Sequence, residues 1–211
     1  MKRRKRLSDL CIALGIVFML GAVSLTLYNE YESGRSEAEK DQILTVLQEK
    51  AVLTPQATSP QQPQETKEPL PDTPADFKTE MTEVIVDGYG YIGSLSLLSL
   101  DAEFPIMSGW NGERLKIAPC RYFGSVFTDD LIIAGHNYRK GFGMLKKLKT
   151  GDCVVFTDMD GNSYEYVVDL IEVLQAEDID GMVNSPWELS LYTCTYDGQS
   201  RLTVRCKRTD R

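Results

Sequence analysis

Basic residues are in the minority in this sequence: 23 lysines and arginines stand against 31 aspartates and glutamates, a net charge of −8. A chain this acidic does not attract the phosphates of nucleic acids, so we expect no nucleic-acid partner. The one strongly basic run is residues 2–6. Its meaning depends on the segment that follows it.

Histidine and closely spaced cysteines are also scarce. The sequence has a single histidine, His136, and five widely separated cysteines without any C-x-x-C pair. Structural zinc sites need clustered cysteines and histidines, and disulfide-dense domains need many cysteines, so neither is indicated. We therefore expect no metal ion and no cofactor.

Long hydrophobic runs are absent except for one. Residues 10–28 carry no charge, and 19 residues of helix extend about 28 Å, roughly the hydrocarbon thickness of a bilayer. A cleaved signal peptide is the alternative, although its apolar region is usually only about 7–15 residues long. Basic residues precede the run and acidic residues follow it, so the positive-inside rule places residues 1–9 in the cytoplasm. Residues 1–28 thus predict an uncleaved anchor in the cell membrane, with the remainder of the chain extracellular.

Proline is concentrated in one stretch, residues 53–74, which has six prolines and almost no apolar side chains. Such a segment cannot form a core and is typical of an extended, semi-rigid spacer. The charged segment 29–52 before it has a few clustered apolar residues, which predict a short helix. We expect residues 29–80 to hold the next domain away from the membrane.

The remaining segment, residues 81–211, is rich in short stretches of Val, Ile, Leu, Tyr and Thr separated by turn sequences such as Asp-Gly. Residues 158–162 predict a hairpin between two of these stretches, and only residues 143–148 look helical. Many short strands predict an all-β domain, a closed or nearly closed barrel, rather than a parallel sheet with crossover helices. The expected strands are residues 82–86, 91–97, 131–134, 153–157, 164–174, 189–193 and 202–206.

His136 stands where the predicted strand 131–134 enters a polar, glycine-bearing loop at residues 137–143. Strand ends of this kind are where a rigid scaffold presents reactive side chains to solvent. By itself, a histidine in this position is more often a surface or capping residue.

Cys194 ends the strand-like stretch 189–194. Alternation of side chains places it on the face opposite to the leucines at 189 and 191, which is the less apolar face. Cys206 shares a face with apolar residues instead, and we expect it to be a buried small hydrophobe, like Cys120 and Cys153.

Arg201 opens the stretch that follows Cys194, and the turn-forming segment 195–200 between them predicts a hairpin that returns Arg201 beside the cysteine. Arg205 points to the same face but lies about 13 Å further along the strand, too far to share a reacting centre. A thiolate nucleophile needs a nearby base, which a histidine can supply near neutral pH. A guanidinium can stabilise an oxyanion without taking part in proton transfer.

The string LYTCTYDGQSRLTVRCKR resembles the TLxTC…R-x-V segment of sortases, and LIIAGHNY resembles their histidine segment. The order His, Cys, Arg and the layout of basic tail, single span, spacer and β-domain are similar too. The resemblance covers about residues 82–208 and is compatible with B-like and D-like classes. It implies an eight-stranded sortase barrel with Cys194 as nucleophile, His136 as acid/base and Arg201 as stabilising cation.

The resemblance also implies where a substrate is bound. Thr193 matches the family threonine that lines the substrate site, and Asn137 and Tyr192 are the other expected contacts. Tyr192 stands where many members have a different residue.

Sortases are cysteine transpeptidases of the Gram-positive cell surface. They cleave an LPxTG-like sorting signal of a secreted protein, hold the acyl part as a thioester, and transfer it to an amine on a cell-wall precursor or a pilin. The resemblance implies these partners here.

Two other functions compete with this one. Papain-like and NlpC/P60-type peptidases place the cysteine before the histidine, which is the reverse of the order here. The second alternative is an anchored, non-catalytic β-barrel binding or assembly module in which Cys194 and Cys206 form a disulfide. A count of free thiols separates it from an enzyme.

Overall fold

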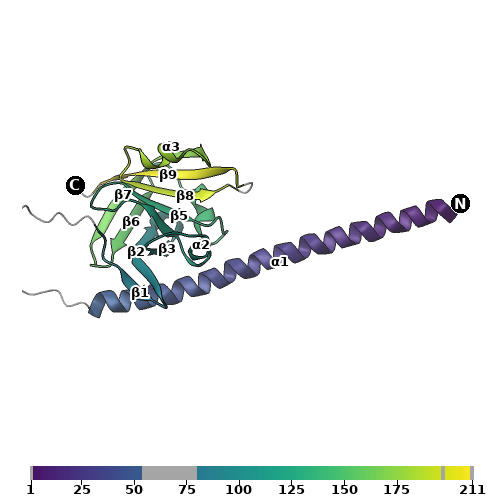
Figure 1. Ribbon diagram of the computed structural model, residues 1–211, viewed down its shortest axis with the longest axis horizontal. Helices are drawn as coiled ribbons and strands as arrows, with labels where there is room; N and C mark the ends of the chain where they lie inside the picture. Colours follow the sequence, from purple (N-terminus) through teal and green to yellow (C-terminus); the bar gives the residue numbers. More distant parts are fainter. Residues whose placement is uncertain (1, 54–79, 196–197, 210–211) are drawn as a thin grey trace, which may run out of the picture.

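The computed structural model describes residues 2–53, 80–195 and 198–209. Figure 1 shows one long helix, α1 (Lys2–Leu53), lying along one side of a β-domain that begins at β1 (Val84–Val86). Residues 54–79, which include nearly all of the expected spacer, lie outside the described part of the chain.

Eight strands of the β-domain form a closed barrel, as the sequence predicted. Their hydrogen-bonded order is β2-β3-β4-β5-β8-β9-β7-β6, and a β2–β6 pairing closes the ring, while β1 only extends β2 at its edge. The strands after β1 are β2 (Tyr89–Leu97), β3 (Ala102–Met107), β4 (Cys120–Phe123), β5 (Leu131–Gly135), β6 (Cys153–Asp158), β7 (Ser163–Gln175), β8 (Leu189–Cys194) and β9 (Ser200–Arg208).

Closure of the barrel depends on β2, which pairs with β3 on one side and with β6 on the other. A register shift between Tyr91 and Gly93 bends the strand where the pairing with β6 begins. Gly93 has φ 155°, and a Cβ at this position would lie 2.1 Å from the carbonyl oxygen of Thr157 in β6. Only glycine allows the two backbones to approach this closely.

Two strands, β3 and β4, and two short helices were not predicted from the sequence. β3 contains Pro105, which argues against a strand, but β3 has a neighbour on its second side only where Met107 pairs with Cys120. The missed helices are α2 (Arg114–Ile117) and α3 (Ile179–Val183). The helical segment expected at residues 143–148 is the 3₁₀-helix η2 (Phe142–Lys147), and η1 (Leu98–Leu100) is a further 3₁₀ turn.

The predicted hairpin at residues 158–162 joins β6 to β7. It is held by the buried carboxylate of Asp158, which accepts hydrogen bonds from the backbone N–H groups of Asp160 and Asn162 and from the Tyr164 hydroxyl. These hydrogen bonds stabilise the turn and the start of β7.

Helix α1 packs against the outside of the barrel through a second apolar cluster, separate from the barrel core. Ile43 and Leu47 of α1 are buried there against Val86, Tyr91 and Met107. The helix expected within residues 29–52 is part of α1, which also includes the preceding segment. Contact with the barrel is made before the proline-rich segment begins.

The described residues of α1 include apolar side chains that are more than half exposed, among them Phe18, Leu20 and Leu27. In the described ranges, no helix is both long enough and apolar enough to cross a membrane.

We predict that Leu47→Asp releases α1 from the barrel, because a carboxylate cannot be buried among apolar side chains without a partner. The docked arrangement should lose about 3 kcal/mol or more, which amide hydrogen exchange would report as faster exchange in residues 40–53 and in β1. Gln42→Asp, at an exposed position of the same helix, is the matched control. Equal exchange in the two variants would contradict the packing described here.

Candidate functional site

Three neighbouring strands bring the predicted catalytic residues to one end of the barrel. In the parallel pair β5–β8, Gly135 lies opposite Thr193, so His136 and Cys194 both follow directly after paired residues. In the antiparallel pair β8–β9, Cys194 lies opposite Arg201, as the hairpin prediction required. Directly opposed residues in such pairs have Cα atoms about 4.5–5.5 Å apart.

The His136 loop is fixed by two glycines. A Cβ on Gly135 would lie 2.3 Å from the ring of Phe142, which packs directly on the backbone before the histidine. A Cβ on Gly143 would lie 2.5 Å from the Tyr138 carbonyl oxygen and 2.8 Å from Oδ1 of Asn137. Asn137 is therefore placed against the inside of this loop and is half-buried.

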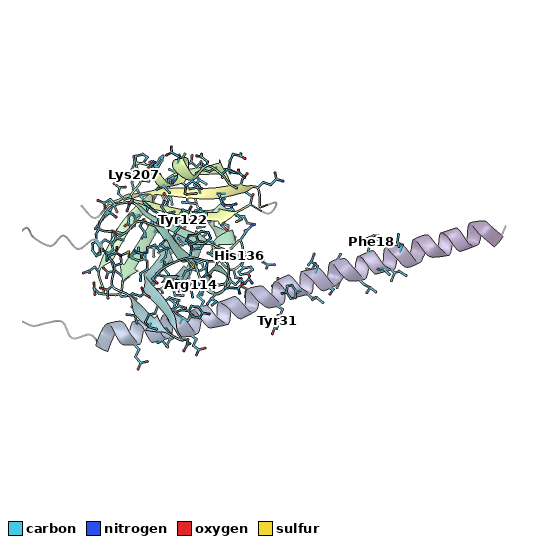
Figure 2. The ribbon with its side chains drawn as sticks, in the orientation of Figure 1. Phe18, Tyr31, Arg114, Tyr122, His136 and Lys207 are labelled. Atoms are coloured by element: carbon cyan, nitrogen blue, oxygen red, sulfur yellow. The ribbon has the colours of Figure 1, made fainter. Side chains whose placement is uncertain are left out.

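The imidazole of His136 is exposed and stacks on the ring of Tyr138, with centroids 4.3 Å apart and an interplanar angle of 3°. Figure 2 shows His136 on the side of the barrel that faces α1. A small cavity beside it is lined by Lys40 of α1, Phe104 and Lys140 among others, and Arg139 of the loop lies 3.8 Å from Glu30. Helix α1 thus forms part of the surroundings of the histidine.

Cys194 is half-buried at the end of β8, on the outer face of the barrel. The preceding Thr193 points the other way and is 2% exposed, and its Oγ1 has no hydrogen-bond partner among the described residues. Thr193 therefore lies behind the surface that presents Cys194. Its contact with a substrate stays a prediction.

Arg201 is half-buried, and its Nη1 donates to the carbonyl oxygens of Gly198 and Ser200, both at 3.2 Å. These bonds hold the guanidinium at the turn between β8 and β9. The turn itself is closed by bonds between Thr195 and Ser200.

Tyr192 lies on the same face of β8 as Cys194 and leads into a chain of aromatic rings. Its ring meets Tyr122 edge-on at 5.5 Å, and Tyr122 lies 5.5 Å from Trp110. Burial is the main cause that raises the pKa of Tyr192, and the charges of Tyr122 and Cys194 raise it further while Arg201 lowers it. Tyr192 is thus a neutral hydroxyl close to both catalytic candidates of the hairpin.

An open groove of about 650 Å³ continues from these rings between β4 and α3. Large apolar side chains in it are well exposed, including Trp110, Phe123 and Ile179. The full lining is Trp110, Tyr122, Phe123, Ile179, Asp180, Val183 and Asn184. A surface of this kind on a folded domain is typical of a binding site for another molecule.

The other cysteines differ in their surroundings. Cys120 and Cys206 are fully buried as predicted, and burial raises the pKa of both thiols, that of Cys120 to about 12. Cys153 is exposed, so the prediction that it is buried is wrong; it begins β6 at the barrel surface.

The register excludes the disulfide of the non-catalytic alternative. Cys206 pairs with Leu189, five residues before Cys194 on β8, which is about 17 Å away at the usual strand rise. Cys120, Cys153, Cys194 and Cys206 are all free.

Comparison with known proteins agrees with this architecture. The family model described as Sortase domain matches residues 95–209, more than half of the chain, and the chain belongs to the sortase family. No curated protein sequence matches it.

Solved structures give the same fold. Sortase A from Corynebacterium diphtheriae superposes with a TM-score of 0.53 at 27% identity, over 58% of this chain and 62% of that one. Sortase C from Streptococcus pneumoniae (24% identity, TM-score 0.52, 57% of this chain and 70% of that one) shows the fold alone. The structure of Clostridium perfringens sortase C with the C-terminal cell wall sorting motif likewise shows the fold alone (24% identity, TM-score 0.51, 57% of this chain and 71% of that one).

Accessibility predicts which thiols react in the native protein. Iodoacetamide near pH 8 should alkylate Cys194 and Cys153, while Cys120 and Cys206 should react only after denaturation, because they are buried and stay protonated well above pH 8. Mass mapping of the peptides that contain these four cysteines gives their rates separately. Rapid native labelling of Cys120, or labelling of Cys194 only after reduction, would contradict the site.

Proposed function

We propose that this chain is a membrane-anchored cysteine transpeptidase that cleaves LPxTG-like sorting signals. The observation that carries the proposal is the strand register at one end of a sortase barrel. It aligns Gly135, directly before His136, with Thr193, directly before Cys194, and Cys194 with Arg201.

In the first half-reaction the thiolate of Cys194 attacks the carbonyl carbon of the residue before the scissile bond. A carbon–sulfur bond forms and the carbonyl electrons move to the oxygen. When the tetrahedral intermediate collapses, the carbon–nitrogen bond breaks and the imidazolium of His136 gives its proton to the leaving amine. The acyl part then remains on Cys194 as a thioester.

In the second half-reaction an incoming amine gives a proton to the neutral imidazole of His136 and attacks the thioester. Cys194 leaves as a thiolate, which returns the site to its starting state. His136 can serve both steps because it is exposed at the end of β5, where a substrate amine can reach it.

Arg201 stabilises the negative charge on the oxygen of both tetrahedral intermediates. Its present partners are the two carbonyl groups of the turn, so it is held next to Cys194 before any substrate binds. A guanidinium fixed in advance contributes most in a site from which water is partly excluded.

The groove between β4 and α3 binds the sorting signal. It starts from the aromatic rings around Tyr192, and its exposed apolar side chains suit the Leu-Pro part of such a signal. The acceptor is an amine on a cell-wall precursor or a pilin. Membership in the sortase family supports both partners.

The apolar segment at residues 10–28 anchors the chain in a Gram-positive cell membrane, with the barrel outside. Its described apolar side chains project from α1 and are mostly more than half exposed, and a lipid environment would cover them. From Tyr28 to Lys40, which lies beside the His136 cavity, α1 rises about 18 Å. The helix thereby sets the height of the active site above the bilayer, where lipid-linked acceptors are found.

Incubating the full-length chain in detergent micelles with a panel of LPxTG-like peptides tests the proposal. We expect intact-mass spectrometry to show a gain equal to the N-terminal peptide fragment, released by hydroxylamine as a thioester would be. Cys194→Ala should abolish the adduct, and Cys153→Ala, which removes an exposed thiol elsewhere on the barrel, should leave it unchanged. An adduct that survives in Cys194→Ala would refute the assignment of the nucleophile.

Arg201→Lys should lower kcat about 10²–10³-fold, because a lysine cannot reproduce the donors of the guanidinium. The alkylation rate of Cys194 by iodoacetamide should stay the same, since that reaction forms no oxyanion. Arg208→Lys, at the far end of the same strand, is the control and should leave kcat near wild type. A parallel fall of both rates in Arg201→Lys would mean that the arginine acts on the thiol instead.

A further inference from the structure

A second arginine of β9, Arg205, lies beneath the α3 segment and takes no part in the proposed chemistry. Its side chain is 1% exposed, which is unusual for an arginine. A buried guanidinium is tolerated only where its N–H groups are hydrogen-bonded.

The hydrogen bonds of Arg205 join β7, β8 and the β7–β8 connection. Nε donates to Oε1 of Glu172 at 2.8 Å, and Nη1 donates to Oγ of Ser190 at 2.9 Å. The remaining bonds go to the connection: Nη1 to the carbonyl oxygen of Met182 (3.2 Å) and to Oγ of Ser185 (3.3 Å), and Nη2 to the carbonyl oxygen of Gly181. The guanidinium also lies over the ring of Trp187, 5.3 Å from its centroid.

Helix α3 needs contacts with the barrel to be stable. It has only five residues, too few to be stable alone, and Met182 is its one buried residue. Asp178 caps its first turn by accepting from the backbone N–H of Gly181. Arg205 supplies the matching contact near its last turn, where backbone carbonyls lack helical partners and a cation is favourable.

Arg205 also shares one face of the β8–β9 hairpin with the catalytic candidates. The opposed pairs along this face are Cys194 with Arg201, Tyr192 with Thr203, and Ser190 with Arg205. The same rigid ladder therefore fixes the nucleophile at one end and the support of α3 at the other.

Helix α3 is one wall of the groove, to which it contributes Ile179 and Val183, while Trp110 and Tyr122 line the other side. The width of the groove depends on where α3 stands above the hairpin. Among the described residues, Arg205 makes the side-chain hydrogen bonds that tie the backbone of α3 to β9.

We propose that Arg205 is a positioning residue that sets the width of the peptide groove by holding α3 on the catalytic face of the hairpin. It controls how tightly the sorting signal binds without touching the reacting atoms. The proposal rests on the proposed function, because it assigns the groove to the peptide substrate.

Arg205→Met in the full-length chain, which keeps the length of the side chain but removes its donors, provides the test. We expect KM for the peptide to rise about tenfold or more, with kcat changed less than about threefold. Amide exchange in residues 176–188 should become faster, and the iodoacetamide rate of Cys194 should be unchanged.

Arg208→Met is the matched control. Arg208 is also a largely buried arginine of β9, but it donates to Val126 and Asp129 of the β4–β5 connection and stacks on Tyr164. Its loss should destabilise the barrel without changing KM or the exchange of residues 176–188.

If Arg205→Met does not fold, Ser185→Ala removes a single contact on the α3 side and should raise KM in the same direction, by a smaller factor. A KM unchanged in a folded variant, or a fall in kcat alone, would overturn the proposal. If the wild-type chain forms no thioester with any peptide, the proposed function fails separately. In that case, unchanged exchange of residues 176–188 in Arg205→Met would still refute the positioning role.

Discussion

The site depends on the backbone pairing of β8, which lies between a parallel neighbour, β5, and an antiparallel neighbour, β9. The first pairing brings the end of β5, and with it His136, beside Cys194. The second returns Arg201 to the same cysteine. A slip of one residue would turn Cys194 into the core and Thr193 to the surface, because side chains alternate along a strand. The buried residues on the inner face of β8 prevent such a slip.

Side chains of the β8–β9 hairpin also contact both sides of the groove. On one side, Tyr192 meets Tyr122 and begins the aromatic wall of the groove. On another, Arg205 ties α3 down as the opposite wall. Helix α1 packs on a different part of the barrel and passes the His136 loop. In Figure 1, α1 and α3 lie on opposite sides of the barrel, so the proposed membrane anchor and the proposed peptide groove use separate surfaces.

Alternation and local turn chemistry predicted seven of the strands, the two hairpins, a closed or nearly closed barrel and the outward face of Cys194, while the resemblance to sortases implied the eight strands of the barrel. Features that depend on contacts between distant segments were not predicted. β3 was hidden by Pro105, which is tolerated because that strand is mostly unpaired on one side. Cys153 lies among apolar residues in sequence, yet its own position faces solvent. The groove could not be predicted, because its lining comes from three separate segments, and Arg205 carried no local sign that α3 would cover it.

The most direct test of the account is a crystal structure of the full-length chain carrying a peptide thiol analogue of the sorting signal. We predict a covalent bond to Sγ of Cys194, with the apolar part of the peptide in the groove between α3 and the rings of Trp110 and Tyr122. The carbonyl oxygen of the bound peptide should lie within hydrogen-bond reach of Arg201. A peptide attached to Cys153, or one on Cys194 that leaves this groove empty, would contradict the account.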